Sequence, residues 1–165
     1  MELPDLAFRS TGGGFERLGG AATRWLVLYV YPRSGGPGIA LPDDWDLIPG
    51  ARGCTPQSCA FRDHHTELRD LDATVRGVSA QPAQEQEEFT ARMHLPFPIL
   101  NDSDLRLADP PLRLPTFTVD NMTLFKRVTL VADRGIIRRV FYPVFPPERN
   151  ADEVIQFLSA GRRAE

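Results

Sequence analysis

The segment "WLVLYVYP" at residues 25–32 holds the longest apolar run of the chain and predicts the central strand of the fold. Its residues are mostly β-branched or aromatic, and nothing interrupts the extended pattern before Pro32. The run is only about a third of the length that a membrane-spanning helix needs. We therefore interpret it as a strand buried inside a globular domain.

Helical and extended patterns alternate after this strand. The sequence predicts a helix over residues 55–73, a short strand over 74–80 and a second helix over 83–95. Chains in which strands and helices alternate in this way usually form α/β domains, with helices packed on a central sheet.

The C-terminal part predicts a hairpin followed by one more helix. Two β-rich runs around Asp133, Arg134 and Gly135 predict the hairpin over residues 127–142. Asn150 is a suitable N-cap for the last helix, and Glu153 follows three positions later, as in a capping box. Together with the preceding elements, this order predicts an α/β fold with a central mixed β-sheet flanked by helices.

A long loop is predicted at about residues 33–53, "RSGGPGIALPDDWDLIPGARG", because this stretch is rich in glycine and proline. Loops of this length inside a compact domain are often functional. A free loop would seldom expose Trp45 and Ile48 together, so we expect them to pack over the functional site or against a partner chain. The length of 165 residues suits one compact domain, so we expect residues 1–165 to form a single domain with this insertion.

Charge and composition exclude several classes of partner. The formal net charge is −3, and no basic stripe is present, which argues against nucleic acid or an anionic membrane as the main partner. The N-terminal residues lack the basic and apolar regions of a secretory signal, so we expect a cytoplasmic protein. In that compartment a close pair of cysteines is more often redox-active or metal-binding than structural.

Both cysteines of the chain lie in the segment "GCTPQSCAFRD" at residues 53–63. Cys54 stands at the expected start of the first helix, where free backbone N–H groups and the helix dipole favour an anion such as a thiolate. Gly53 allows a small substrate to approach the backbone closely. The segment is therefore typical of a site that holds a reactive sulfur.

Cys59 follows five positions after Cys54, and this spacing constrains any disulfide between them. Five residues of an intact helix advance by about 7.5 Å along its axis. A disulfide needs Cα atoms roughly 4.4–6.8 Å apart. We therefore expect the two cysteines to bond only after the first helical turn unwinds, through oxidation of Cys54 to a sulfenic acid and attack by Cys59.

Two other interpretations of the pair are possible from the residues alone. Buried cysteines are often inert packing residues. Cys54, Cys59, His64 and His65 could together bind zinc, although their spacing differs from that of common zinc sites.

Several segments together resemble the peroxiredoxins, and among them the bacterioferritin-comigratory, or Q, group. The segment "GCTPQSCAFRD" resembles the signature of this group, in which a peroxidatic cysteine is followed by a threonine and, four residues later, by a resolving cysteine. The resemblance extends over most of the chain, through "WLVLYVYP", "GVSA" at 77–80, "LPFPILND" at 95–102 and "KRVTLVADRGIIRRVF" at 126–141.

The resemblance implies a thioredoxin-like fold and a role for each matching residue. Cys54 would be the peroxidatic cysteine, Cys59 the resolving cysteine, and Arg127, rather than its neighbour Lys126, the arginine that stabilises the thiolate. Gly53 and Thr55 would contact the substrate. The implied reaction is the reduction of hydrogen peroxide or a small organic hydroperoxide, with thioredoxin or a similar dithiol protein as reductant. No metal or organic cofactor is implied, nor is a nucleic acid or membrane partner, and we expect a monomer or weak homodimer.

Two positions depart from the group's pattern. Leu47 stands where the family has proline, and Ala51 stands where it has a threonine or serine whose hydroxyl bonds the thiolate and the peroxide. The loop before Cys54 is also longer than in the group. Another donor, such as Thr55 or Arg52, could replace the hydroxyl. Alternatively, the protein could be a redox sensor, a partner-binding protein or a thiol-disulfide oxidoreductase with weak peroxidase activity.

Overall fold

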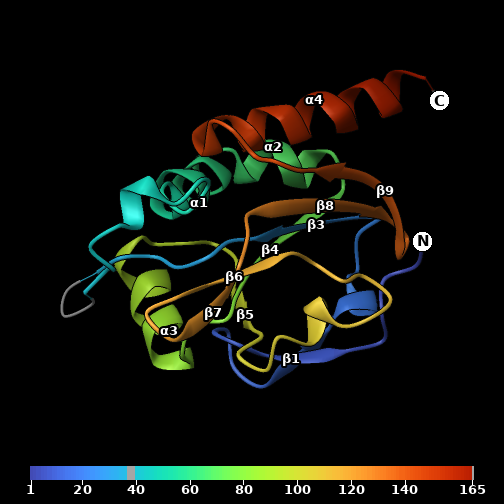
Figure 1. The fold of residues 1–165 in the computed structure, drawn as a ribbon. Helices are drawn as coiled ribbons and strands as arrows, with labels where there is room; N and C mark the ends of the chain where they lie inside the picture. The colour runs from blue at the N-terminus through green and yellow to red at the C-terminus, as the bar shows by residue number, and fades with distance from the viewer. Residues whose placement is uncertain (37–39, 165) are drawn as a thin grey trace.

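A computed structural model describes residues 1–36 and 40–164 and contains one large mixed sheet (Figure 1). Residues 37–39 of the predicted long loop lie outside the described part. The large sheet has seven strands in the order β2-β1-β5-β4-β3-β8-β9. Its strands are β1 (Ala7–Ser10), β2 (Phe15–Arg17), β3 (Trp25–Val30), β4 (Ala73–Ser79), β5 (Ile99–Asn101), β8 (Val128–Asp133) and β9 (Ile136–Phe141).

Strand β3 lies inside this sheet, as its apolar sequence predicts. It pairs in parallel with β4 and antiparallel with β8, and β4 pairs in parallel with β5. Strands β8 and β9 form the predicted hairpin, whose turn contains Gly135 in the left-handed region at φ 84°. The prediction of a central mixed sheet flanked by helices is therefore confirmed.

The α-helices pack mainly through one core cluster, and Figure 1 shows α1, α2 and α4 together above the strands. This cluster joins Val27 and Tyr29 of β3 to residues from every α-helix, including Phe61, Phe89 and Val154. The α-helices are α1 (Cys54–Asp63), α2 (His65–Asp70), α3 (Ala83–Arg92) and α4 (Asn150–Arg163). Among the described residues, no helix combines the length and the apolar character that crossing a bilayer requires.

The predicted helix over 55–73 is divided into α1 and α2 at His64. The backbone there has φ −100° and ψ 12°, which ends the regular helical turn. The His64 imidazole lies 2.8 Å from the Glu67 carboxylate and 3.3 Å from that of Asp152 on α4. The hydrogen bond with Glu67 raises the pKa of His64 above its usual value, so the ring gains charge more readily at this junction. The break therefore coincides with a polar link between α2 and α4.

The predicted capping box at the start of α4 is wrong. Asn150 is the first residue of the helix rather than its N-cap, because the 3₁₀ turn η4 (Pro147–Arg149) leads directly into it. The Asn150 side chain is fully buried and bonds Gln57 and Thr129 of other elements. Hydrogen bonds from other elements therefore occupy the side-chain oxygen that would cap the helix in a capping box.

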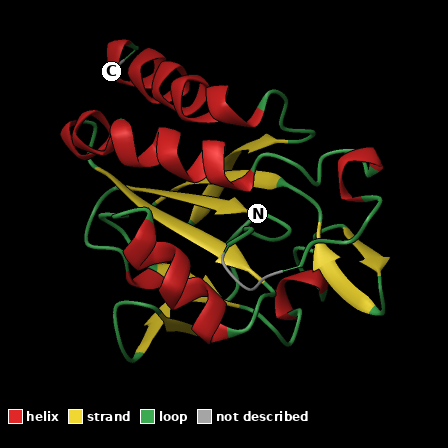
Figure 2. Ribbon diagram, turned by 90° about the vertical axis from the view of Figure 1, so that its left-hand side faces the viewer, coloured by secondary structure: helices red, strands yellow, loops and turns green. Residues whose placement is uncertain are grey.

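A second, two-stranded sheet was not predicted from the sequence. It consists of β6 (Thr116–Val119) and β7 (Met122–Phe125), which pair in antiparallel fashion apart from the large sheet (Figure 2). The turn between them holds Asp120 and Asn121 at φ 48° and 61°. Aspartate and asparagine tolerate these left-handed angles better than most residues do, which explains their presence in a tight hairpin turn.

We expect Phe61→Ala to lower the free energy of unfolding by about 3–5 kcal/mol, because it removes a fully buried ring. The Phe61 ring stacks on that of Tyr29 with centroids 4.7 Å apart, so α1 would also lose an aromatic contact with β3. Urea unfolding measures the loss. Phe15→Ala serves as the control because Phe15 is 75% exposed, and its change should stay within about 0.5 kcal/mol. Equal losses for both variants would contradict this packing.

Candidate active site

Gly53 controls how the long loop enters α1. It is the N-cap of the helix and has φ 109°, in the region that favours glycine. A Cβ atom at this position would lie 2.6 Å from Cγ of Pro147, in the turn η4. Only glycine fits between the helix start and this turn, and the close approach fixes the position of the next residue, Cys54.

The sulfur atom of Cys54 lies at the first position of α1 and is almost enclosed. The residue is only 3% exposed, and its Sγ atom lies 3.1 Å from Nη2 of Arg127, which donates to it. The helix N-terminus and the guanidinium both favour negative charge on this sulfur. The structure thus brings together Cys54 and Arg127, two of the predicted site residues.

Arg127 precedes β8 and is itself 3% exposed. Its Nη2 group donates to the carbonyl oxygens of Ala51 and Arg52, each at 3.2 Å, and its Nη1 group donates to Oε1 of Gln57 at 2.6 Å. The Ala51 carbonyl also lies 3.8 Å from Cys54 Sγ. Ala51 therefore contributes its backbone oxygen to the site, although its side chain has no hydroxyl group.

Gln57, Asn150 and Thr129 extend this polar contact into the core, and none of them is among the site residues that the sequence predicts. Nε2 of Gln57 donates to Oδ1 of Asn150 at 3.1 Å, and the hydroxyl of Thr129 donates to the same oxygen at 2.6 Å. Gln57 could have been found because it lies one helical turn after Cys54. Thr129 could have been found because it lies two residues after Arg127, and side chains two positions apart in extended backbone point to the same side. Asn150 comes near only through the tertiary fold.

Cys59 lies on the second turn of α1 and is half-buried. Both cysteines are free, and Sγ of Cys59 contacts Sδ of Met93 at 3.8 Å. Arg62 donates to the backbone carbonyl of Met93 at 2.8 Å, so this residue is held over α1. Because α1 is a regular helix from Cys54 onward, the two cysteines stand apart, as their spacing predicts.

The aromatic floor below α1 is neutral. Tyr29 donates from its hydroxyl to Oγ of Ser58 at 3.0 Å, and its ring lies between those of Tyr31 and Phe61. Burial raises the pKa of Tyr29 well above its ordinary value, so the phenol keeps its proton. These neutral rings therefore add no negative charge that would compete with the sulfur for Arg127.

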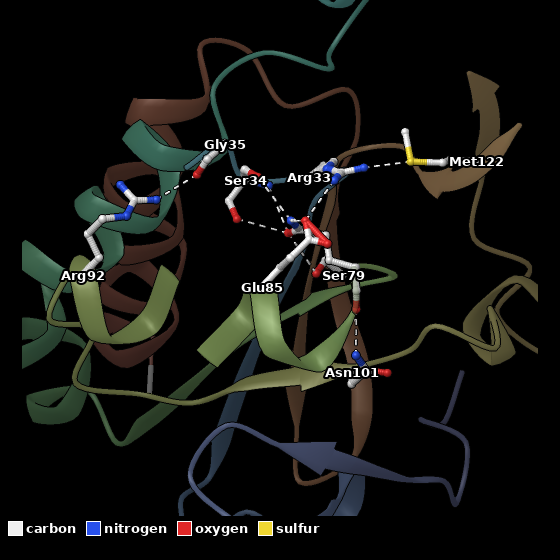
Figure 3. A network of polar contacts seen from close by, with 9 residues as sticks. Arg33, Ser34, Gly35, Ser79, Glu85, Arg92, Asn101 and Met122 are labelled. Atoms are coloured by element: carbon white, nitrogen blue, oxygen red, sulfur yellow. Dashed lines mark hydrogen bonds and ion pairs between the residues drawn. The ribbon is translucent and has the colours of Figure 1, made fainter. Parts of the chain in front are cut away.

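The start of the long loop is fixed by a polar network (Figure 3). Arg33 donates to Glu85 of α3 at 2.9 Å and to Sδ of Met122 of β7 at 2.7 Å. The backbone N–H and the hydroxyl of Ser34 both donate to Oε1 of Gln81, at 3.0 and 3.1 Å. The loop is therefore attached at its start both to α3 and to the β6–β7 hairpin.

The end of the loop is fixed by apolar packing on the same hairpin. Trp45 is 5% exposed and packs with Ala51, Leu124 and the half-buried Ile48. The sequence predicts that Trp45 and Ile48 pack over the functional site or against a partner chain, whereas they pack on the β6–β7 hairpin of the same chain. The cluster includes Ala51, three residues before Cys54. Leu47, in the place where the family has proline, is 80% exposed.

The remaining predicted residues lie near Cys54 or form no cluster. Thr55 is half-buried in the first turn of α1, directly after Cys54. Across residues 1–36 and 40–164, no group of three or more histidine, cysteine or acidic side chains is arranged to hold a metal ion. The zinc interpretation of Cys54, Cys59, His64 and His65 is therefore not supported by their placement.

The segment that contains both cysteines matches a known protein family. The model of the AhpC/TSA family matches residues 47–140, which contain both cysteines and Arg127. Peroxiredoxin Bcp of Bacillus subtilis is 32% identical over 109 residues, covering 66% of this chain and 60% of the relative. Chloroplastic peroxiredoxin Q of Arabidopsis thaliana is 28% identical over 159 residues, covering 95% of this chain and 65% of the relative. The chain thus spans less than two thirds of the length of these relatives.

Solved structures share the fold along almost the whole chain. Peroxidoxin BcpB from Mycobacterium tuberculosis superposes with a TM-score of 0.78 at 23% identity, covering 97% of this chain and 95% of the other. The bacterioferritin comigratory protein of Xanthomonas campestris gives 0.76 at 24% identity, covering 98% and 97%. These likenesses confirm the predicted thioredoxin-like fold. The chain therefore belongs to the AhpC/TSA family, within the group of Bcp and Q peroxiredoxins that its cysteine motif indicates.

Proposed function

We propose that this protein is a thiol-dependent peroxidase in which Cys54 is the peroxidatic residue. The observation that carries the proposal is the 3.1 Å contact between Nη2 of Arg127 and Sγ of Cys54 at the start of α1. A thiolate in this position has a buried cation beside it and the positive end of a helix dipole behind it. This arrangement would stabilise the negative charge of a nucleophilic thiolate. It would also stabilise the negative charge that develops on the leaving oxygen of a peroxide.

In the proposed first step, the Cys54 thiolate attacks one oxygen atom of the peroxide. An S–O bond forms while the O–O bond breaks, and Cys54 becomes a sulfenic acid. The other oxygen leaves as hydroxide or alkoxide and takes a proton to become water or an alcohol. Arg127 and the backbone amides near Gly53 and Cys54 would stabilise the negative charge on the leaving oxygen. Thr55 would contact the substrate from the first turn of the helix.

In the second step, the thiol of Cys59 attacks the sulfur of the sulfenic acid, releases water and forms a disulfide with Cys54. Cys54 lies in the core cluster and Cys59 lies against Met93, both on a regular helix. The first turn of α1 has to unwind before the sulfur atoms can meet. A dithiol protein such as thioredoxin would then reduce the disulfide and restore the free cysteines.

The enclosure of Cys54 limits the size of the substrate that can reach it. Because Cys54 is only 3% exposed, the substrate would be hydrogen peroxide or a small organic hydroperoxide. The chain would act as a single domain, as a monomer or weak homodimer, and without nucleic acid, membrane or cofactor. The bacterial relative is compatible with a cytoplasmic location, whereas the plant relatives carry chloroplastic names.

Ala51 is the observation that favours a second candidate, a redox sensor or thiol-disulfide oxidoreductase. A missing hydrogen bond to a charged group is worth roughly 1.5–3 kcal/mol, and about 1.4 kcal/mol changes a rate tenfold. The Ala51 carbonyl accepts from Arg127 and thereby holds the guanidinium near the sulfur. Because this contact uses the backbone, the absence of a hydroxyl leaves it intact, and turnover with peroxide separates the two candidates.

With one equivalent of hydrogen peroxide, we expect the wild-type protein to lose both thiols rapidly and to form the disulfide between Cys54 and Cys59. Cys59→Ser should stop at a sulfenic acid on Cys54, because the resolving thiol is absent. Cys54→Ser should show no fast loss of thiol. Thiol titration and mass spectrometry of a trapped sulfenic acid measure these products. If Cys54→Ser lost its remaining thiol as fast as the wild type, the assignment of the peroxidatic residue would be wrong.

We expect Arg127→Met to slow the oxidation of Cys54 by about 10²–10³-fold, since it removes the donor beside the sulfur. Lys126→Met is a matched control, because it removes the neighbouring cation, which is exposed. This control should stay within about twofold of the wild type, consistent with the small effect of most exposed charges. Stopped-flow rates with hydrogen peroxide provide the comparison, and similar rates for all three proteins would refute the role of Arg127.

Oxidation to the disulfide should increase amide hydrogen exchange at the start of α1, around residues 51–60. The reason is that the disulfide cannot form on the intact helix observed in the reduced protein. Hydrogen exchange with mass spectrometry on the reduced and oxidised forms measures the change, and β3 and β8 should stay protected in both. Unchanged exchange in the segment would mean that the disulfide closes without local unfolding.

A further inference from the structure

Asn150 has a buried side chain that neither helix capping nor the chemistry at Cys54 explains. It is fully buried at the start of α4, and its Oδ1 atom accepts two hydrogen bonds. One comes from Nε2 of Gln57 on α1 and the other from the hydroxyl of Thr129 on β8. Its Nδ2 atom is buried without a hydrogen-bond partner.

The orientation of the Gln57 amide determines whether a hydrogen-bond acceptor or a donor faces Arg127. A guanidinium group carries only donors, whereas a glutamine amide has an acceptor on one side and a donor on the other. Oε1 of Gln57 faces Nη1 of Arg127 at 2.6 Å, and its Nε2 faces Asn150. If the amide were reversed, two donors would face each other beside a buried cation, and Arg127 would lose this partner.

Asn150 presents the atom that excludes the reversed orientation. Its Oδ1 atom requires a donor from Gln57, and only Nε2 can supply one. Thr129 adds a second bond to this oxygen, because its hydroxyl donates to it from the sheet. The lack of a partner for Nδ2 is informative, because it means that the two bonds to Oδ1 set this orientation.

We propose that Asn150 is a positioning residue that fixes the amide orientation of Gln57 and thereby holds Arg127 against the sulfur of Cys54. This inference deepens the proposed function and rests on it for its role in catalysis. Four residues contribute in sequence: the threonine on β8, the asparagine on α4, the glutamine on α1 and the arginine before β8. Asn150 touches neither the sulfur nor the peroxide, and acts through Gln57 and Arg127.

The test measures the ionisation of Cys54 without peroxide, so it does not depend on turnover. In a Cys59→Ser background Cys54 is the only thiol, and its alkylation by iodoacetamide is followed from pH 4 to 10. Asn150→Leu should raise the midpoint of this profile by about one pH unit and slow alkylation below the midpoint about tenfold. Thr129→Val should shift the midpoint in the same direction. Because valine keeps the shape of threonine, this variant provides the test if Asn150→Leu fails to fold.

A double-mutant cycle with Gln57→Glu distinguishes amide orientation from loss of packing. Both oxygens of a carboxylate are acceptors, so a glutamate faces Arg127 with an acceptor whatever Asn150 presents. Asn150→Leu should therefore produce no further shift when it is added to Gln57→Glu. Gln86→Leu is a matched control, since Gln86 is another buried amide, bonded to Ser79 and Leu100 in a separate network. This control should leave the midpoint unchanged.

Three results would overturn the inference: no shift with Asn150→Leu and Thr129→Val, an equal shift in the Gln57→Glu background, or an equal shift with Gln86→Leu. Thermal unfolding of each variant shows whether a variant is folded before its profile is compared. A failure of the proposed function gives a different pattern. In that case the profiles would follow the predicted cycle, while the wild-type protein would not consume peroxide.

Discussion

A guanidinium group buried beside a sulfur atom requires acceptors around it, because an unpaired charge is costly in the protein interior. Arg127 is 3% exposed and finds neutral acceptors in the carbonyls of Ala51 and Arg52 and the amide oxygen of Gln57. Its Nη2 group also donates to Sγ of Cys54 at 3.1 Å, whereas its buried Nε has no hydrogen-bond partner. Each partner comes from a defined backbone position, and the electrostatics of the site therefore depend on how loop, helix and strand meet.

The long loop contributes to this arrangement through its two attachments. Arg33 ties its start to α3 and to the β6–β7 hairpin, and Trp45 packs its end on the same hairpin. Ala51 belongs to the Trp45 cluster, so packing of the loop also places the carbonyl that meets Arg127. An apolar residue thus occupies a position where a hydroxyl is expected, and the loop still presents an acceptor to the guanidinium.

Much of the fold and part of the site could be predicted from the sequence. The run at 25–31, the hairpin at 127–142 and the family-like segment around Cys54 have local patterns that determine their structure. The role of Asn150 could not be predicted from local patterns, which predict a helix cap at this position. Its Oδ1 atom instead accepts hydrogen bonds from buried donors on α1 and β8, which only the tertiary fold brings near. The break at His64 likewise coincides with a contact to α4 that no local pattern contains.

The most direct measurement of the central claim is the rate at which the reduced protein reacts with hydrogen peroxide at neutral pH. Stopped-flow mixing with excess peroxide gives the second-order rate constant, which is compared with that of a free small thiol under the same conditions. If Arg127 and the start of α1 activate Cys54, the protein should react faster by about a hundredfold or more. A rate equal to that of the free thiol would contradict the account, because the buried guanidinium would then provide no catalysis.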